Sequence, residues 1–331
     1  MFQFLRKKKN RNFWQGLSRP ILTVAPMDDV TDLAFRQMFA KHGKAQDKMP
    51  VLFTEFVSSD GLLLADKKGK NKLLKKLSFY KNEKPIVAQI FGANPERLAE
   101  AAKLVQKLGF DGVDINMGCP DKSVEKTGAG AALINNKDLA VQIIKSVKNS
   151  VAIPVSVKTR LGYNKTDKDW IESILKTKPD ALIIHLRTRK EMSKVSAHWD
   201  ELSWITQSRD KISKETLLIA NGDIKSVKEA KRKASKYAVD GVMVGRGLFG
   251  NPLFFTGKNL KREDKIELLA EHINIFKKEL LGVKSYSVMK KHFKAYISDF
   301  DDARALRARL MQTNTPEESL QILKQYQDKA L

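Results

Sequence analysis

The chain has 331 residues, of which 42% are hydrophobic, and 61 lysines and arginines against 38 acidic residues give it a net charge of +23. No apolar run approaches the roughly 18 residues that cross a bilayer, and no signal-peptide hydrophobic region follows the N-terminal Met1–Leu5, so we expect neither a membrane-spanning nor a secreted protein. We expect a soluble cytoplasmic protein with one large core and a smaller second unit, whose positive charge favours a polyanionic partner such as RNA, DNA or anionic lipid.

Residues 1–17 form a basic N-terminal segment. The cluster Arg6–Arg11 is followed by Phe13 and Trp14. The sequence leaves two interpretations open for this segment: a further RNA contact, or a tail that lies outside the main fold.

Eight apolar segments recur after this tail, separated each time by enough residues for a helix and two loops. They are Ile21–Pro26, Val51–Phe56, Pro85–Gly92, Gly112–Gly118, Pro154–Arg160, Ala181–Arg187, Leu217–Asp223 and Gly241–Gly247. The intervening stretches have helical features: Asn94 and Pro95 begin one helix, whose stripe includes Leu98 and Leu108, and Gly109 ends it. Eight strands alternating with helices over residues 18–257 predict a (β/α)8 TIM barrel, with a doubly wound open sheet as the alternative.

The C-terminal ends of these segments favour the barrel, because nearly every one carries a hydrogen-bonding or titratable group. In a barrel such residues meet at one face, where the active sites of these folds lie. They are Pro26-Met27-Asp28, Glu55, Gln89, Asn116 with Cys119, Lys158 with Arg160, His185 with Arg187, Asn221-Gly222-Asp223 and Gly245-Arg246-Gly247.

Cys119 is the single cysteine of the sequence, so it forms no intramolecular disulfide, which indicates a reducing compartment. It follows the apolar run Val113–Ile115, at the point where a strand passes into a loop. Taken alone, this position also fits a small buried hydrophobe.

The last two strand ends predict a phosphate site. Glycines in Asn221-Gly222-Asp223 and Gly245-Arg246-Gly247 allow close approach of the backbone, and Arg246 adds a positive charge. Lys158 is expected across the barrel mouth from this phosphate site. A cation there stabilises the negative charge of a reduced cofactor ring. This pattern favours bound flavin mononucleotide (FMN) over a plain sugar phosphate.

Residues 258–331 differ in character from the barrel segment. Glycine and proline are scarce there, and Ile266, Leu269, Ile273 and Phe276 form one apolar stripe. We expect four helices, the last of them capped by Thr315. Their basic residues are predicted to form one face, which is either an RNA contact or an ordinary solvated surface: Lys290, Lys291, His292, Lys294, Arg304, Arg307 and Arg309.

From Leu22 to about Gln312 the sequence resembles the FMN-dependent, bacterial-type tRNA-dihydrouridine synthase family. The most specific shared feature is Asn116-Met117-Gly118-Cys119-Pro120 joined to Gly128-Ala129-Gly130. Further matching runs are Ala25-Pro26-Met27 with Asp32, Phe53-Thr54-Glu55, Gln89-Ile90-Phe91-Gly92, Val157–Gly162, Arg187-Thr188-Arg189, Asn221-Gly222-Asp223 and Gly245-Arg246-Gly247.

The resemblance implies an FMN-binding barrel, a helical tRNA-binding domain over residues 258–331, and reduction of D-loop uridines in tRNA to 5,6-dihydrouridine, with NADPH as the electron donor. It implies that Cys119 is the general acid that protonates C5 of uracil, while hydride passes from reduced flavin to C6. The implied substrate-binding residues are Asn116, Arg160 and Arg187. The implied cofactor-binding residues are Pro26, Met27, Gln89, Lys158, His185, Asn221, Gly222, Asp223, Gly245 and Arg246.

The expected partners are therefore tRNA and NADPH, with no membrane and no metal, and the protein is expected to act as a monomer. A small-molecule flavin oxidoreductase resembling dihydroorotate dehydrogenase is the alternative function. It explains the barrel and the phosphate site but not the basic helical segment.

Overall fold

The computed structural model describes residues 12–45 and 48–328 of the chain. Within them, parallel strands form one sheet in the order β1, β9, β8, β7, β6, β5, β4, β2, and β3 pairs with β4 as well. The strands are β1 Ile21–Val24, β2 Leu52–Phe53, β3 Val57–Ser58, β4 Ile86–Phe91, β5 Gly112–Met117, β6 Val155–Arg160, β7 Ala181–His185, β8 Leu217–Asn221 and β9 Gly241–Val244.

Backbone hydrogen bonds between β1 and Val51 close this sheet into a barrel. Val24 N–H donates to Val51 O (2.9 Å), and Val51 N–H donates to Leu22 O (3.0 Å). The predicted TIM barrel is therefore confirmed, and the open-sheet alternative is wrong. Each predicted segment contains or adjoins a strand, and β3 continues along β4 after the turn at Glu55.

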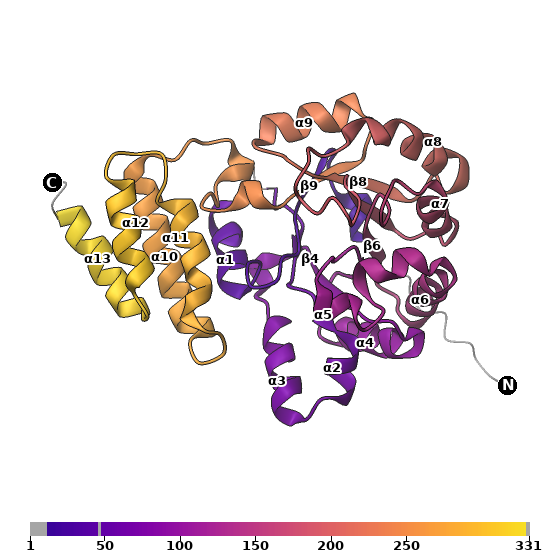
Figure 1. The fold of residues 1–331 in the computed structure, drawn as a ribbon, viewed down its shortest axis with the longest axis horizontal. Helices are drawn as coiled ribbons and strands as arrows, with labels where there is room; N and C mark the ends of the chain where they lie inside the picture. The colour runs from indigo at the N-terminus through magenta and orange to yellow at the C-terminus, as the bar shows by residue number, and fades with distance from the viewer. Residues whose placement is uncertain (1–11, 46–47, 329–331) are drawn as a thin grey trace.

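Helices cover the outside of the barrel (Figure 1). They are α1 Leu33–His42, α2 Ser59–Leu64, α3 Lys67–Lys76, α4 Pro95–Lys107, α5 Lys122–Glu125, α6 Lys137–Ser150, α7 Lys168–Lys176, α8 Leu202–Ile212 and α9 Val227–Lys236. The short 3-10 helices among them are η1 Phe13–Gly16, η2 Lys81–Glu83, η3 Gly130–Asn135, η4 Trp199–Glu201, η5 Arg246–Leu248 and η6 Phe254–Thr256.

The helix α4 shows why local sequence predicts these elements well. The side chain of Asn94 accepts from Arg97 N–H (2.8 Å), so it caps the helix as expected. Leu98 is buried against the barrel, whereas Leu108, expected on the same stripe, is 40% exposed because it lies beyond the last helical residue. Gly109 ends the helix with φ at +88°, a conformation that favours glycine.

The aromatic pair Phe13 and Trp14 packs at the end of the barrel where the strands begin. Trp14 is 1% exposed in a cluster with Ile21 and Phe53, and Asn12 Nδ2 donates to Asp180 Oδ1 (2.6 Å). Residues 12–17 therefore belong to the barrel instead of a tail, and Trp14 is not an exposed RNA contact. Residues 1–11 lie outside the described part of the chain.

The four predicted C-terminal helices are confirmed. They are α10 Arg262–Leu280, α11 Lys290–Tyr296, α12 Ala303–Gln312 and α13 Pro316–Asp328, with the 3-10 helix η7 Tyr286–Met289 before α11. This helical unit lies beside the barrel, next to α1 (Figure 1). Leu33, Ala34 and Met38 of α1 share its apolar cluster with Ile266 and Phe276, so α1 serves both units. Among the described residues, no helix has the length and apolar character needed to cross a membrane.

Two histidines lie fully buried where α1, α10 and α11 meet. The rings of His272 and His292 are 4.7 Å apart, and both contact Phe35. Among the described residues, neither ring nitrogen of His272 has a hydrogen-bond partner. The same is true of Nδ1 of His292. His292 is 1% exposed, so its predicted place on a basic surface is wrong: the apolar face of α11 turns it toward α1.

We predict that the free energy of unfolding falls as the pH drops below about 6.5. Burial lowers the pKa of His272 to about 3 and that of His292 well below its ordinary value, so the unfolded chain binds protons that the folded chain does not. Each histidine that is protonated only in the unfolded chain lowers the free energy of unfolding by about 1.4 kcal/mol per pH unit in this range. Urea titrations at a series of pH values measure the effect. The His272→Leu variant should show a shallower dependence, and an unchanged slope would contradict this origin.

Candidate active site

The strand ends of β1, β6, β7, β8 and β9 surround a cavity of about 240 Å³ at the barrel mouth. Ten of the predicted site residues line it: Pro26, Met27, Lys158, His185, Arg187, Asn221, Gly222, Asp223, Gly245 and Arg246. Ser193, in the loop after β7, also lines the cavity and was not among the predicted site residues. A serine in a polar loop gives no pattern by which to find it.

Register explains why these side chains converge. In the parallel ladder Asn116 pairs with Lys158, Arg160 pairs with His185, and His185 pairs with Asn221. Residues paired across neighbouring strands point to the same face of a sheet. The order of the strands around the barrel therefore places one polar group beside the next along the mouth.

The loops after β8 and β9 form a cradle that requires glycine. Gly222 has φ at +146°, and a Cβ there would lie 2.6 Å from the Cβ of Ala197. A Cβ on Gly247 would lie 2.3 Å from Ile224 O. A Cβ on Gly245 would lie 3.6 Å from Ala25 Cβ and Met27 Sδ, in ordinary contact, so sterics do not require a glycine at this position. The cradle fits a phosphate group held by backbone N–H donors.

Asp223 links two arginines at the edge of this cradle. It accepts from Arg187 Nη2, from Arg246 Nη2 (3.0 Å) and from Ala197 N–H (2.9 Å). Burial raises the pKa of Asp223, but the hydrogen bonds and the arginine charges outweigh it and hold that pKa below its usual value. The side chain of Arg246 is 62% exposed and reaches the open cavity, whereas that of Arg187 is only 2% exposed.

Arg187 also donates to Val195 O (2.7 Å) and to His185 Nε2 (3.1 Å). An arginine is always a donor, so His185 accepts at Nε2 and carries its proton on Nδ1. Burial, followed by the charges of Arg160, Lys158 and Arg187, lowers the pKa of His185 well below its usual value. His185 is therefore a neutral side chain, and Arg187 orients it and Asp223.

Lys158 is a half-buried cation that lines the mouth cavity. Among the described residues, none accepts a hydrogen bond from it and no carboxylate lies within 4 Å of Nζ. Burial, followed by the charge of Arg160, lowers its pKa to about 8. Since burying an unpaired charge is costly, this position fits an anionic ligand that supplies the missing partner.

A buried network below the mouth fixes Asn116. Gln89 Nε2 donates to Asp114 Oδ2 (2.6 Å), and Asn116 Nδ2 donates to Gln89 Oε1 (2.8 Å). Ser156 Oγ donates to Asp114 Oδ1 (2.5 Å), and burial raises the pKa of Asp114 to about 6. Gln89 is fully buried in this network and does not line the cavity.

Asn116 in turn holds the loop that carries Cys119. Its Oδ1 accepts from Gly118 N–H (3.1 Å) and Cys119 N–H (2.9 Å), and Cys119 O accepts from Ala131 N–H (2.9 Å). A Cβ on Gly130 would lie 2.8 Å from Cys119 O, so the loop needs a glycine there. The amide of Asn116 thus positions Cys119.

Arg160 ties this loop to the loop after β7. Its Nε donates to Gly118 O (2.8 Å), and its Nη1 donates to Thr188 O (3.1 Å) and Met192 O (3.0 Å). Burial lowers the pKa of Arg160 to about 10. The arrangement holds two active-site loops together, a role that the position of Arg160 at a strand end does not reveal.

The thiol of Cys119 is half-buried and forms no disulfide. Burial raises its pKa, and among the smaller effects the charges of Arg160 and Lys158 lower it. The group is therefore a protonated thiol at neutral pH, with two cations in its neighbourhood. It is able to donate a proton, and it is a poor nucleophile.

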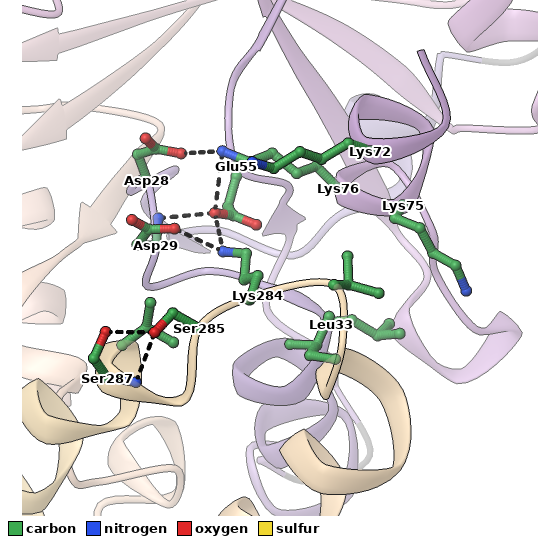
Figure 2. Close-up of a pocket in the computed structure, with 13 residues that line it drawn as sticks. Asp28, Asp29, Leu33, Glu55, Lys72, Lys75, Lys76, Lys284, Ser285 and Ser287 are labelled. Atoms are coloured by element: carbon green, nitrogen blue, oxygen red, sulfur yellow. Dashed lines mark hydrogen bonds and ion pairs between the residues drawn. The ribbon is translucent and has the colours of Figure 1, made fainter. Parts of the chain in front are cut away.

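Two of the predicted strand-end acids lie outside the mouth. Asp28 and Glu55 line a second cavity, of about 380 Å³, between the barrel and the helical unit. Figure 2 shows Lys284 Nζ between Glu55 (2.6 Å) and Asp29 (3.0 Å), while Lys76 reaches Asp28 (2.6 Å). Sequence reasoning missed Lys284, because its partner Glu55 lies 229 positions away.

We predict that alkylation of Cys119 has a pH midpoint above that of a free thiol, about 8.5. Since it is the sole cysteine of the sequence, iodoacetamide uptake by the protein reports on it directly. The Lys158→Arg variant should move the midpoint lower, because a lysine with a pKa of about 8 has lost most of its charge where Cys119 titrates, whereas arginine keeps its charge. Lys158→Met, which has no charge at any pH, is the control and should leave the midpoint nearly unchanged. A midpoint unmoved by Lys158→Arg would show that the two groups do not interact.

The family model described as dihydrouridine synthase matches residues 23–331. The chain is 40% identical over 321 residues to a probable tRNA-dihydrouridine synthase of Staphylococcus aureus (strain COL), covering 96% of each chain. It is 39% identical over 327 residues to the probable tRNA-dihydrouridine synthase 2 of Bacillus subtilis (strain 168), covering 97% of this chain and 98% of the relative.

Among solved structures, histamine dehydrogenase from Rhizobium sp. 4-9 superposes with a TM-score of 0.52 at 13% identity, over 77% of this chain. The 6-hydroxypseudooxynicotine amine oxidase of Pseudomonas geniculata N1 gives a TM-score of 0.51 at 14% identity, over 70% of this chain. The match spans 49% and 46% of those two proteins. At this identity the likeness concerns the fold.

Proposed function

The chain belongs to the dihydrouridine synthase family, and we propose that it reduces specific D-loop uridines of tRNA to 5,6-dihydrouridine, with bound FMN as cofactor and NADPH as electron donor. One observation carries this proposal: an unpaired, desolvated lysine and a protonated thiol lie near one another beside a phosphate cradle. Reduction of the C5–C6 double bond of uracil needs a hydride donor and a separate proton donor. Here the cradle and Lys158 would hold a flavin that supplies the hydride, and Cys119 would supply the proton.

The cradle supports FMN as the cofactor. Gly222, Gly245 and Arg246 would hold its phosphate, and Lys158 would stand beside the negatively charged edge of the ring. Pro26 and Met27 would pack against the ring from β1. When bound, FMN supplies the hydride that adds to C6 of the uracil.

Cys119 supplies the proton to C5 in this proposal. Its raised pKa keeps the proton on sulfur until the carbanion character at C5 develops. Asn116 holds the backbone of the Cys119 loop from below, and Arg160 holds it from the side. Their task is to keep the thiol at one distance from the bound base, because a small misplacement of a reacting group slows proton transfer strongly.

The helical unit supports tRNA as the substrate. Lys291 and Lys294 on α11 and Arg304 on α12 are exposed, and phosphate contacts are the main source of affinity for RNA. Extruding a base from a folded loop costs a few kcal/mol, which such contacts offset. Arg307 instead donates to Ile297 O (2.8 Å) and Arg309 to Gln325 Oε1 (2.8 Å). We further propose that the protein acts on tRNA as a monomer in the cytoplasm.

Reoxidation of the reduced protein tests the function. We expect NADPH to bleach the flavin of the anaerobic protein, and tRNA from a strain lacking dihydrouridine to restore its colour. In Cys119→Ala the reoxidation should be slowed by about a hundredfold or more, the usual contribution of a general acid, while bleaching by NADPH is retained. Cys119→Ser tests whether a weaker acid of similar size rescues part of the rate.

One result would overturn the proposed substrate, and another would overturn the proposed acid. Reoxidation by free pyrimidines but not by tRNA would favour the small-molecule flavin oxidoreductase. Full activity of Cys119→Ala with tRNA would leave the synthase but remove the cysteine as its acid.

We predict that Arg246→Ala weakens FMN binding by roughly tenfold or more, since a hydrogen bond to a charged group contributes about 1.5–3 kcal/mol. Flavin absorbance per mole of purified protein, followed by equilibrium dialysis against FMN, measures the loss. Arg232→Ala removes an exposed arginine from α9 and serves as the matched control. Equal flavin content in all three proteins would exclude Arg246 from the phosphate site.

A further inference from the structure

The helix α3 is an unusually basic element. Six of its ten residues are lysines, Lys67, Lys68, Lys70, Lys72, Lys75 and Lys76, and it contains no acidic residue. It buries none of its side chains completely, although Leu73 and Leu74 pack against the barrel core. Figure 1 shows α2 and α3 as a hairpin that projects from the barrel.

Most of this charge has no partner. Lys76 is committed to Asp28 (2.6 Å) and lies 3.7 Å from Glu55. For the other five lysines, no carboxylate lies within 4 Å among the described residues. Lys68, Lys72 and Lys75 are exposed and follow the spacing i, i+4, i+7, so they share one face of the helix.

This pattern differs from an ordinary solvated surface. Like charges four residues apart destabilise a helix, and Lys68–Lys72 and Lys72–Lys76 are both such pairs. On α9, by contrast, Lys233 is paired with Glu229 (3.1 Å) in the same turn spacing. A helix that merely confers solubility has charges of both signs interspersed, whereas α3 retains repulsion that a polyanion would relieve.

The position of α3 relates it to the mouth. Lys72, Lys75 and Lys76 line the second cavity together with Asp28 and Asp29, and Met27, the residue before them, lines the mouth cavity. The two cavities therefore adjoin across the loop after β1. Figure 2 shows Lys75 pointing away from Asp28, Asp29 and Glu55, so it forms no ion pair with those carboxylates.

The C-terminal half of α3 is attached to the barrel. Leu73 and Leu74 pack against the barrel core, and the Lys76–Asp28 pair (2.6 Å) ties the last turn to the loop after β1. A lysine face held in this way keeps a fixed direction relative to the mouth. A ligand that extends beyond the mouth would meet this face in a fixed position. No mobile segment of the protein would have to become ordered on binding.

We propose that α3 binds the sugar–phosphate backbone of the RNA substrate, at nucleotides that adjoin the one held in the mouth. The proposal rests on the function proposed above and adds a contact on the barrel itself, separate from the helical unit. Lys68, Lys72 and Lys75 are the residues that make it. Contacts of this kind fix register and carry no sequence information.

The triple variant Lys68→Gln, Lys72→Gln, Lys75→Gln tests this surface. Glutamine has a helix propensity close to that of lysine, so circular dichroism and flavin content should match those of the unmodified protein. We expect tRNA binding to weaken by about tenfold or more, and the slope of log K against log salt to fall by roughly 2 to 3. In turnover assays KM for tRNA should rise, with kcat largely retained.

The matched control removes three exposed charges from α9: Lys228→Gln, Lys231→Gln and Arg232→Gln. An unchanged salt slope in the α3 variant, or an equal loss in the α9 control, would overturn the proposal. Sedimentation with phosphatidylserine vesicles, abolished by the α3 changes while tRNA binding persists, would assign α3 to a membrane surface instead. If tRNA fails to reoxidise the reduced flavin of the unmodified protein, the proposed function is wrong. The tRNA-binding measurements on the α3 variant still decide whether α3 contacts RNA.

Discussion

The feature on which the rest of this structure depends is the parallel closure of the barrel. Hydrogen bonds between β1 and Val51 join the two ends of the sheet, so every strand ends at the same mouth. The interior below is filled by apolar side chains and by one satisfied polar network around Asp114. Many polar residues at the strand ends therefore face this mouth, and Lys158, Arg187 and Arg246 give its lining more positive charge than Asp223 offsets.

That surplus charge determines the chemistry of the mouth. Lys158 is half-buried and has no carboxylate within ion-pair distance among the described residues, and the charge of Arg160 lowers its pKa beyond the effect of desolvation. The same environment keeps His185 neutral and the Cys119 thiol protonated, because burial acts on each of them. A site of this kind favours a ligand that brings negative charge and leaves an uncharged proton donor next to it. The electrostatics of the mouth thus suit both an anionic cofactor and a proton transfer at neutral pH.

The helical unit is joined to this mouth by packing and by charge. The helix α1 contributes to its apolar cluster, and Lys284 reaches from the segment after α10 to Glu55 and Asp29, which lie on loops after two barrel strands. Removing one partner of such a buried pair would leave an uncompensated charge, so the contact fixes how the two units meet. A macromolecular substrate then encounters the mouth, α3 and the helical unit in one arrangement.

The sequence by itself determined the strands, the helix boundaries and the face on which function lies. Those features follow from local patterns: apolar runs, caps such as Asn94, and glycines such as Gly222 whose backbone conformation admits little else. The tertiary structure decided which polar residues face the cavity and which support it. Gln89, Asn116 and Arg160 follow the same strand-end pattern as Lys158, yet Asn116 and Arg160 hold the Cys119 loop and Gln89 holds Asn116. His292 turned inward, and Lys284 found partners more than two hundred residues away, because packing between units that are distant in sequence sets those contacts and no local pattern encodes them.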